Sequence, residues 1–248
     1  MSKKQDFTSQ PEFSSSSYFG SLSKPQDWQD RIGTVANRFN REYRGETLEL
    51  PEEVKAMPIA QERAAGLLQA KLASPFWQIA QPQKNQRCLD LGCGVSFLIY
   101  PWRDWGAIFY GQEVSTVARD ILNARGPQFN SKLFKGVVLA PAHQLDYEAG
   151  QFDLAIATGV SCYYPIDYWA EVLAAVKKVL KPGGFFAFDI LDPEMPLAEN
   201  WAILETYLGA EVFLESATDW KKIIQAAGGS IAKSQPGELF QLLKVRFG

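Results

Sequence analysis

The sequence predicts a doubly wound α/β fold with a mostly parallel sheet, preceded by an N-terminal helical extension. Short apolar runs such as "RCLDL" and "FDLAIAT" lack the polar alternation of a half-exposed strand, so each is expected to be covered on both faces. Segments with helical periodicity separate these runs, which is typical of a parallel sheet with crossover helices. The first roughly 80 residues, by contrast, contain helical periodicity and no strand-like run.

The N-terminal part divides into a tail and a helical cap. Residues 1–25 are rich in serine, glutamine and proline and are predicted to be a disordered tail. Residues 26–82 are predicted to form the cap. Its first helix is expected from Asp27 to near Gly45, because apolar residues recur every three or four positions. These residues are Trp28, Ile32, Val35, Phe39 and Tyr43.

Arginines mark the other side of this first helix. Arg31, Arg38, Arg41 and Arg44 lie mostly off the apolar line and are predicted to form a solvent-exposed face. Further along the cap, a short helical turn is expected in "ELPEEVKAMP" and a longer helix from Ile59 to Leu72.

Residues 83–248 are predicted to form the α/β domain. Strands are expected at 87–91, 107–112, 136–140, 152–158, 185–190 and 239–247. Helices are expected at 116–125, 169–180 and 220–227. The second of these is the clearest, and the "KPGG" after it is a stop signal because proline cannot continue the hydrogen-bond ladder and glycine accepts a left-handed exit.

Composition excludes several functional classes. The net charge of -3 argues against a surface that neutralises phosphates, so no nucleic-acid partner is expected. No apolar run is long enough to cross a bilayer, and the lysines near the start precede no secretory signal. Cys88, Cys93 and Cys162 have no metal-ligand spacing and are too few for a disulfide framework, so a reducing, cytoplasmic location without a bound metal is expected.

A glycine turn at the end of the first strand predicts a ligand site. In doubly wound sheets ligands bind outside the carboxyl ends of the strands, often at the first strand-to-helix turn. Gly92 and Gly94 remove side chains where a ligand has to approach the backbone. Phe97 stands where a dinucleotide motif requires glycine, and the preceding Asp90 would repel a pyrophosphate. The turn therefore predicts a ligand with positive charge and no phosphate.

A second acid limits the class of ligand that the site is predicted to bind. Glu113 ends the second strand, where a carboxylate can accept hydrogen bonds from the hydroxyls of a ribose. A ribose joined to a cationic group without phosphate describes S-adenosylmethionine, which we expect as the cofactor.

Four ordered motifs resemble those of class I S-adenosylmethionine-dependent methyltransferases. They are "LDLGCG" at 89–94, "GQEVS" at 111–115, "FDLAIATG" at 152–159 and "VLKPGGFFAFD" at 179–189. The resemblance covers about residues 85–190 well and implies a seven-stranded, Rossmann-like sheet. Helices before the first strand commonly cover the site in this family, although the cap aromatics are weighed here as helix core more than as substrate pocket.

The resemblance also implies a set of cofactor-binding residues. They are Asp90, Gly92, Cys93, Gly94, Glu113, Val114, Pro141, Ala142, His143, Thr158 and Gly159. The turn residues 90 and 92–94, together with Thr158 and Gly159, would hold the methionine end. Glu113 would bind the ribose, Val114 would pack on the adenine face, and the loop 141–143 would lie along the adenine edge. The chain departs from the family where many members carry an adenine-binding acid after the third strand, since Pro141 and Ala142 stand there. The family's third turn glycine is Ser96.

No catalytic residue is assigned, and Tyr163, Tyr164 and His143 are weak candidates. The expected function is methyl transfer to a small or medium-sized, partly apolar molecule. The alternatives are a non-catalytic protein that binds S-adenosylmethionine for regulation and, less favoured, a nicotinamide-dependent oxidoreductase. The acceptor, the atom methylated and the oligomeric state are not predicted.

Overall fold

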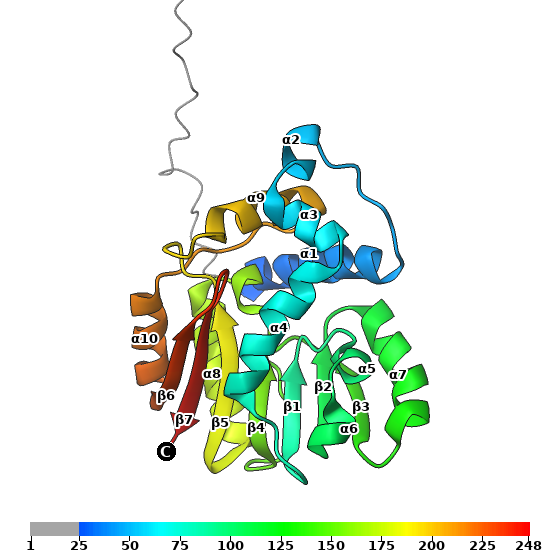
Figure 1. The fold of residues 1–248 in the computed structure, drawn as a ribbon. Coiled ribbons are helices and arrows are strands. Elements are labelled where there is room, and N and C mark those ends of the chain that lie inside the picture. Colours follow the sequence, from blue (N-terminus) through cyan, green and yellow to red (C-terminus); the bar gives the residue numbers. More distant parts are fainter. Residues whose placement is uncertain (1–24) are drawn as a thin grey trace, which may run out of the picture.

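Seven strands form one mixed sheet in the computed structural model, which describes residues 25–248 (Figure 1). The strands are β1 (Arg87–Leu91), β2 (Ile108–Glu113), β3 (Phe134–Leu139), β4 (Phe152–Ala157), β5 (Leu180–Ile190), β6 (Gly229–Pro236) and β7 (Gln241–Phe247). Their order is β3-β2-β1-β4-β5-β7-β6, with β7 antiparallel to both of its neighbours. The predicted doubly wound, mostly parallel fold is confirmed. The predicted tail lies almost wholly outside the described residues.

Helices cover both faces of the sheet and its upper end in Figure 1. They are α1 (Pro25–Tyr43), α2 (Glu52–Lys55), α3 (Pro58–Ala64), α4 (Leu67–Ala80), α5 (Ser96–Ile99), α6 (Trp102–Trp105), α7 (Thr116–Asn130), α8 (Ile166–Val179), α9 (Ala198–Leu208) and α10 (Ala217–Ala226), with a 3₁₀ turn at Ser161–Tyr163. In this view α4, α5 and α6 lie in front of the sheet and α8 lies behind it. Along the described residues, no helix is both long and apolar enough to span a bilayer.

The central strands are apolar on both sides because helices pack on both faces. In front of the sheet, Phe97 and Trp102 pack against Phe109 of β2, with ring centroids 5.1 and 4.9 Å away. A second aromatic cluster joins α8 and α10 to β5, where Trp169 packs 5.6 Å from Trp220. Burying such rings supplies much of the hydrophobic stabilisation of a core.

Strand register brings the site segments together. Leu91, the last residue of β1, pairs with Gln112 of β2, and Asp90 pairs with Ile156 of β4. The turn after β1 therefore starts beside Glu113. The helices of residues 25–80 precede β1, and α1 crosses above the upper ends of the strands in Figure 1. The division into a cap and an α/β domain stays a prediction.

Several details differ from the expectations, among them the short helices α5 and α6, which were not predicted. The helix expected at 59–72 is two helices, α3 and α4, because the chain turns at Gly66 with a left-handed φ of 70°. Strand β6 was not predicted, since "GSIAKSQP" is mostly exposed and carries no apolar pattern. Helix α9 was also not predicted.

Candidate active site

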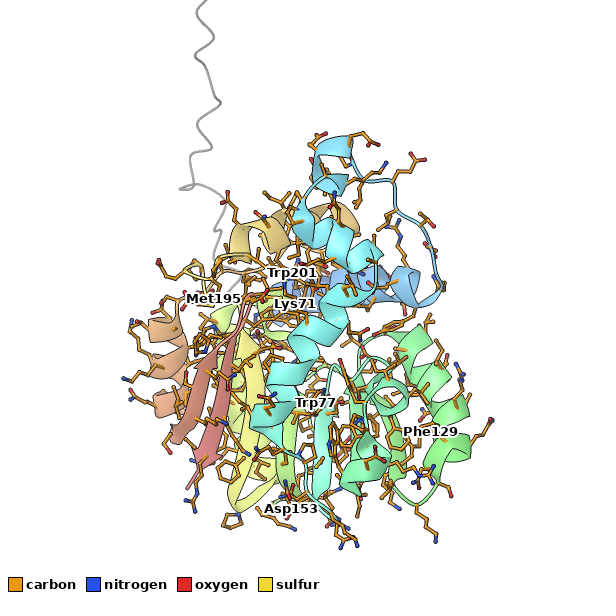
Figure 2. The ribbon with its side chains drawn as sticks, in the orientation of Figure 1. Lys71, Trp77, Phe129, Asp153, Met195 and Trp201 are labelled. Atoms are coloured by element: carbon orange, nitrogen blue, oxygen red, sulfur yellow. The ribbon has the colours of Figure 1, made fainter. Side chains whose placement is uncertain are left out.

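A cavity of about 540 Å3 lies at the carboxyl ends of the parallel strands. One wall, which we call the floor, consists of residues that follow β1 to β4. The other wall, which we call the roof, consists of residues from α1, the α3–α4 region and α9. Figure 2 shows Trp201, a roof residue, at this end of the sheet and Asp153 at the opposite end. The predicted glycine turn and Glu113 both belong to the floor.

The glycine turn needs its glycines for two reasons. Gly92 and Gly94 have left-handed φ angles of 63° and 49°, which other residues rarely adopt. A Cβ on Gly92 would lie 2.6 Å from Cγ2 of Val160, and a Cβ on Gly94 would collide with the hydroxyl of Tyr43. Both glycines and the buried Cys93 line the cavity. Gly92 is therefore packed closely against the floor segment after β4, and Gly94 against Tyr43 of the roof.

Asp90 lies behind this turn instead of on the cavity wall. Its side chain is 1% exposed, and one carboxylate oxygen accepts a hydrogen bond of 2.5 Å from the hydroxyl of Ser96. The other oxygen, Oδ1, has no partner among the described residues. Burial raises the pKa of Asp90 to about 7, the Ser96 bond opposes this shift, and the nearby charge of Glu113 adds to it. Asp90 thus holds the turn through Ser96, which does line the cavity.

Glu113 ties the end of β2 to the glycine turn. Its Oε2 accepts from the amide of Gly94 at 2.6 Å, and its Oε1 accepts from the amides of Val114 and Ser115 at 2.8 Å each. Burial raises the pKa of Glu113, while these three amides act to lower it. A carboxylate has about four lone-pair positions, so one on Oε2 is left for a further donor.

A third buried acid, Asp189 at the end of β5, supports the floor after β4. Its carboxylate accepts from the amide of Gly159 at 2.7 Å and from the hydroxyl of Thr158 at 3.1 Å. Burial raises its pKa to about 7, against the effect of these donors. Thr158 and Gly159 line the cavity as predicted. The role of Asp189 was not predicted, although this acid is the last residue of the motif at 179–189.

The loop after β3 contributes to the cavity only in part. Val114 and Ala142 line it, whereas Pro141 and His143 do not. The Pro141 carbonyl accepts from the side-chain amide of Gln112 at 2.7 Å. The His143 ring packs edge-on against Trp28 and Tyr168, with centroids 5.8 and 5.0 Å away, and burial lowers its pKa.

The roof contains side chains that sequence reasoning did not assign to the site. From α1 come Val35, Phe39, Glu42 and Tyr43, from the α3–α4 region Arg63, Gly66, Leu68, Gln69 and Leu72, and from α9 Trp201. Phe39 and Tyr43 were weighed as helix core, and both line the cavity. Phe76 is core, as expected, and Trp77 packs against Tyr100 with centroids 4.8 Å apart. Helical periodicity alone does not distinguish a cavity wall from a packed core.

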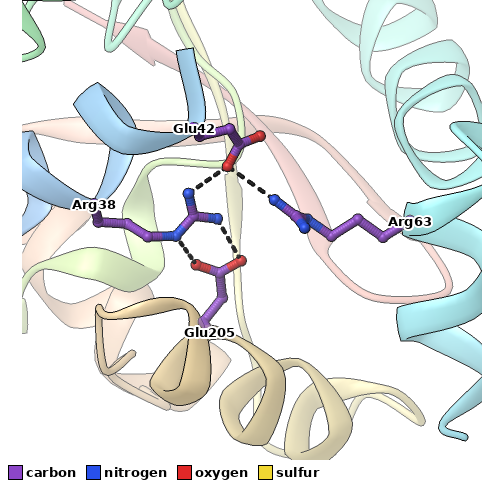
Figure 3. Close-up of polar contacts among 4 residues, drawn as sticks. All are labelled: Arg38, Glu42, Arg63 and Glu205. Atoms are coloured by element: carbon purple, nitrogen blue, oxygen red, sulfur yellow. Dashed lines mark hydrogen bonds and ion pairs between the residues drawn. The ribbon is translucent and has the colours of Figure 1, made fainter. Parts of the chain in front are cut away.

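An ion-pair chain joins three roof helices (Figure 3). Arg38 of α1 forms two hydrogen bonds of 3.1 Å to the fully buried carboxylate of Glu205 on α9. It also pairs with Glu42, which in turn accepts from Arg63 of α3 at 2.9 Å. Arg38 is only 4% exposed, so its prediction as a solvent-exposed residue is wrong. Its partner lies 167 positions away and could not be seen in a helical pattern.

The weak catalytic candidates lie in different environments. Tyr163 and Tyr164 follow β4, line the cavity and are buried, and burial raises the pKa of both phenols well above the usual value. Their hydroxyls therefore stay protonated at neutral pH. His143 lies outside the cavity lining.

Comparison with known proteins gives a consistent picture. Residues 89–188 match the family described as a methyltransferase domain. The chain is 31% identical over 186 residues to a ubiquinone biosynthesis O-methyltransferase from Roseobacter denitrificans, covering 73% of the chain and 64% of that protein. It is 29% identical over 110 residues to a sterol 4-C-methyltransferase from Caenorhabditis elegans, covering 44% of the chain and 32% of that protein. The chain thus spans about a third and just under two thirds of these two relatives.

A solved structure shows the same fold. Geranyl diphosphate C-methyltransferase from Streptomyces coelicolor, in complex with S-adenosyl-L-homocysteine, superposes with a TM-score of 0.66 at 11% identity, over 91% of this chain and 99% of that one.

Proposed function

We propose that this chain, whose residues 89–188 match the methyltransferase-domain family, is a class I S-adenosylmethionine-dependent methyltransferase. In this proposal it transfers a methyl group from S-adenosylmethionine to a small or medium-sized, partly apolar acceptor by in-line displacement. One observation carries this proposal. A single cavity joins the glycine turn and Glu113 to a roof of mainly aromatic and aliphatic side chains. The three cysteines are buried and unpaired, which suits the cytoplasmic location that we propose.

The floor fits a nucleoside with a positive centre. Gly92 and Gly94 line the cavity without side chains of their own, so a ligand can approach their backbone. The remaining lone pair on Oε2 of Glu113 suits a ribose hydroxyl. The Glu113 carboxylate lies at this wall and favours a cation over a phosphate. Gly92, Gly94, Glu113, Val114, Ala142, Thr158 and Gly159 are the residues that we propose to contact the cofactor.

The residues contribute to catalysis mainly by alignment. When bound, the cofactor supplies a methyl group on a sulfonium that leaves as a neutral sulfide. Holding an acceptor in line with that group can supply up to about 7 to 11 kcal/mol of the barrier reduction. Phe39 and Trp201 line this space with apolar rings. Tyr163 and Tyr164 keep their protons at neutral pH, so we assign them to shaping the acceptor space and not to proton abstraction.

The experiment first measures binding of S-adenosylmethionine and S-adenosylhomocysteine by calorimetry. We expect micromolar dissociation constants. No heat and no thermal shift with either ligand would refute the proposal, and competition with a nicotinamide dinucleotide tests the oxidoreductase alternative in the same assay.

The second stage measures methyl transfer by mass spectrometry. The acceptor panel contains phenols and catechols with and without alkyl chains, and sterols, because the two curated relatives are named for a ubiquinone-pathway O-methylation and a sterol C-methylation. Turnover that increases with an alkyl chain supports a partly apolar acceptor. Tight cofactor binding without turnover on any member would favour the regulatory alternative.

A further inference from the structure

Arg63, in the last turn of α3, is the one cationic side chain that lines the cavity within the described part of the chain. The lining also contains two anionic side chains, Glu42 and Glu113. Glu113 already accepts from three backbone amides. Binding pockets are typically apolar with a few polar groups that fix the orientation of the ligand, so Arg63 is a candidate for such a group.

Arg63 and Arg38 differ in how many of their donors are used (Figure 3). Arg38 binds Glu205 through two nitrogens and Glu42 through the third. Arg63 forms one hydrogen bond, of 2.9 Å from Nη2 to Oε2 of Glu42, and its Nε and Nη1 have no partner among the described residues. Whichever hydrogen of Nη2 points to Glu42, a pair of parallel N–H groups stays available on one edge of the guanidinium. Arg38 therefore holds helices together, whereas Arg63 keeps donors for a ligand.

The Arg63 side chain reaches both the cavity and solvent. It is 31% exposed, whereas that of Arg38 is 3% exposed. The rings of Phe39 and Trp201 and the side chain of Leu72 line the same cavity. A ligand with an apolar body and a charged end matches this arrangement. Burial of the body against the apolar side chains is favourable, and a charged end at the partly exposed Arg63 avoids the full cost of desolvation.

The charges around Arg63 favour an anion with a single negative charge. Oε2 of Glu42 lies 2.9 Å from Nη2 of Arg63 and would repel an anion bound beside it. Arg38 pairs with the same oxygen and offsets part of this repulsion. A carboxylate adds one charge and matches the planar guanidinium with two parallel hydrogen bonds. A phosphate monoester adds up to about two charges at neutral pH and would be repelled more strongly.

We propose that Arg63 binds a carboxylate of the methyl acceptor, so that Arg63 is a specificity-determining residue and the acceptor is an apolar carboxylic acid. The carboxylate would accept from N–H groups that Arg63 does not use on Glu42. The apolar body of the acceptor would lie against the rings of Phe39 and Trp201. The proposal rests on the proposed function, because it names the acceptor class for the same cavity.

The experiment compares two probes that have nearly the same shape and differ in charge. Calorimetry at neutral pH measures the binding of 4-hexylbenzoate and of 4-hexylbenzamide to the full-length protein saturated with S-adenosylhomocysteine. We expect wild type to bind the benzoate at least about 10-fold more tightly, as a hydrogen-bonded charge pair predicts. Arg63→Gln should bind the two probes within about 2-fold of each other and keep the wild-type affinity for the benzamide. Arg63→Lys keeps the charge without the planar fork and should show an intermediate preference.

Lys71→Gln is the matched control for the loss of a positive charge. Lys71 lies on α4, pairs with Glu62 and Glu238 and does not line the cavity, so this variant should keep the wild-type preference. Folding is checked by thermal melting. Glu42 keeps its pair with Arg38 in Arg63→Gln, so this variant should melt within about 4 °C of wild type.

Four results would overturn a statement made above, and they can be told apart. If wild type binds both probes equally or binds neither, the inference is overturned, while binding of S-adenosylhomocysteine leaves the proposed function intact. A preference for the benzoate that persists in Arg63→Gln would assign the carboxylate to another residue. A loss of about 10-fold in the affinity of Arg63→Gln for S-adenosylhomocysteine would mean that Arg63 binds the carboxylate of the cofactor instead. If wild type does not bind S-adenosylhomocysteine at all, the proposed function itself fails.

Discussion

The carboxylates that support the floor bind mainly backbone amides, whereas those that support the roof bind arginine side chains. Glu113 and Asp189 accept from the amides of Gly94 and Gly159, over separations of 19 and 30 residues. In the roof, Glu205 is bound by Arg38 across 167 residues. Backbone donors are present whatever the neighbouring side chains are, so the floor tolerates substitutions that the roof does not. We therefore expect the removal of a single charge to lower the free energy of unfolding more in the roof than in the floor.

The largest effect is expected from Arg38→Met. The substitution leaves Glu205 buried without a cation, which typically costs about 3 to 5 kcal/mol. Urea unfolding should show this loss. Arg41→Met is the matched control on the same helix, because its pair with Glu46 is largely exposed and should contribute less than about 1 kcal/mol. Equal losses for both variants would contradict the distinction between a buried roof network and an exposed one.

In the floor, Gly92→Val should weaken S-adenosylhomocysteine binding by at least about 100-fold, or about 3 kcal/mol. The side chain forces a left-handed φ on a β-branched residue and collides with Val160. Calorimetry measures the affinity, and circular dichroism checks that the variant is folded. Gly33→Ala in α1 is the control, since a Cβ there meets nothing within 4 Å and the residue is helical. Wild-type affinity in Gly92→Val would show that the turn does not contact the ligand.

The buried acid behind the turn predicts a pH dependence. The pKa of Asp90 is raised in the folded state to about 7 from an ordinary value of 3.8, so the folded state holds a proton that the unfolded state has released. The contribution of Asp90 to the free energy of unfolding is fully present below the pKa that this group has in the unfolded state. It is lost as the pH rises toward the pKa that the group has in the folded state. Between pH 5 and 7 the loss is about 2 kcal/mol.

Asp90→Asn cannot release this proton, so its unfolding free energy in urea should fall less steeply between pH 5 and 7 than that of wild type. Asp104→Asn, at an exposed position, serves as the control and should keep the wild-type slope. An unchanged slope in Asp90→Asn would mean that Asp90 is ionised throughout this range.

The smallest effect concerns the junction between the two walls. Asn40 of α1 accepts from the hydroxyl of Ser115 at 2.8 Å and from the amide of Val117 at 3.1 Å, at the start of α7. Asn40→Ala removes this acceptor and should cost about 1 kcal/mol in urea unfolding, as the loss of a neutral hydrogen bond does. Asn37→Ala, at an exposed position one turn earlier, should be neutral. A loss as large as that of Arg38→Met would place Asn40 among the roof's main supports.

The floor could be predicted from sequence because its determinants are local. Gly92 and Gly94 follow an apolar strand directly, and parallel strands bring the ends of β1 and β2 to one edge, so Glu113 had to lie nearby. The roof could not be predicted in this way. The buried pairing of Arg38 depends on Glu205, in a helix that has no strong apolar pattern.

Asp90 shows a different limit. The motif predicts that Asp90 holds the methionine end of the cofactor, but its carboxylate is buried and bound by Ser96, a residue noted only as a departure from the family's glycine. Side-chain packing decides whether Asp90 or Ser96 reaches the cavity, and the spacing of residues in the sequence does not predict this packing.

The contact between Tyr43 and Gly94 has a kinetic consequence. The phenol oxygen occupies the space directly over the turn glycine. A molecule that binds against the backbone of Gly94 therefore requires the ring to rotate, or α1 to shift, before it can bind. Association observed by stopped-flow fluorescence should then level off as ligand concentration rises, with a ceiling set by the tyrosine's own movement. Shortening this side chain to alanine should remove the ceiling and leave encounter by diffusion as the slow step.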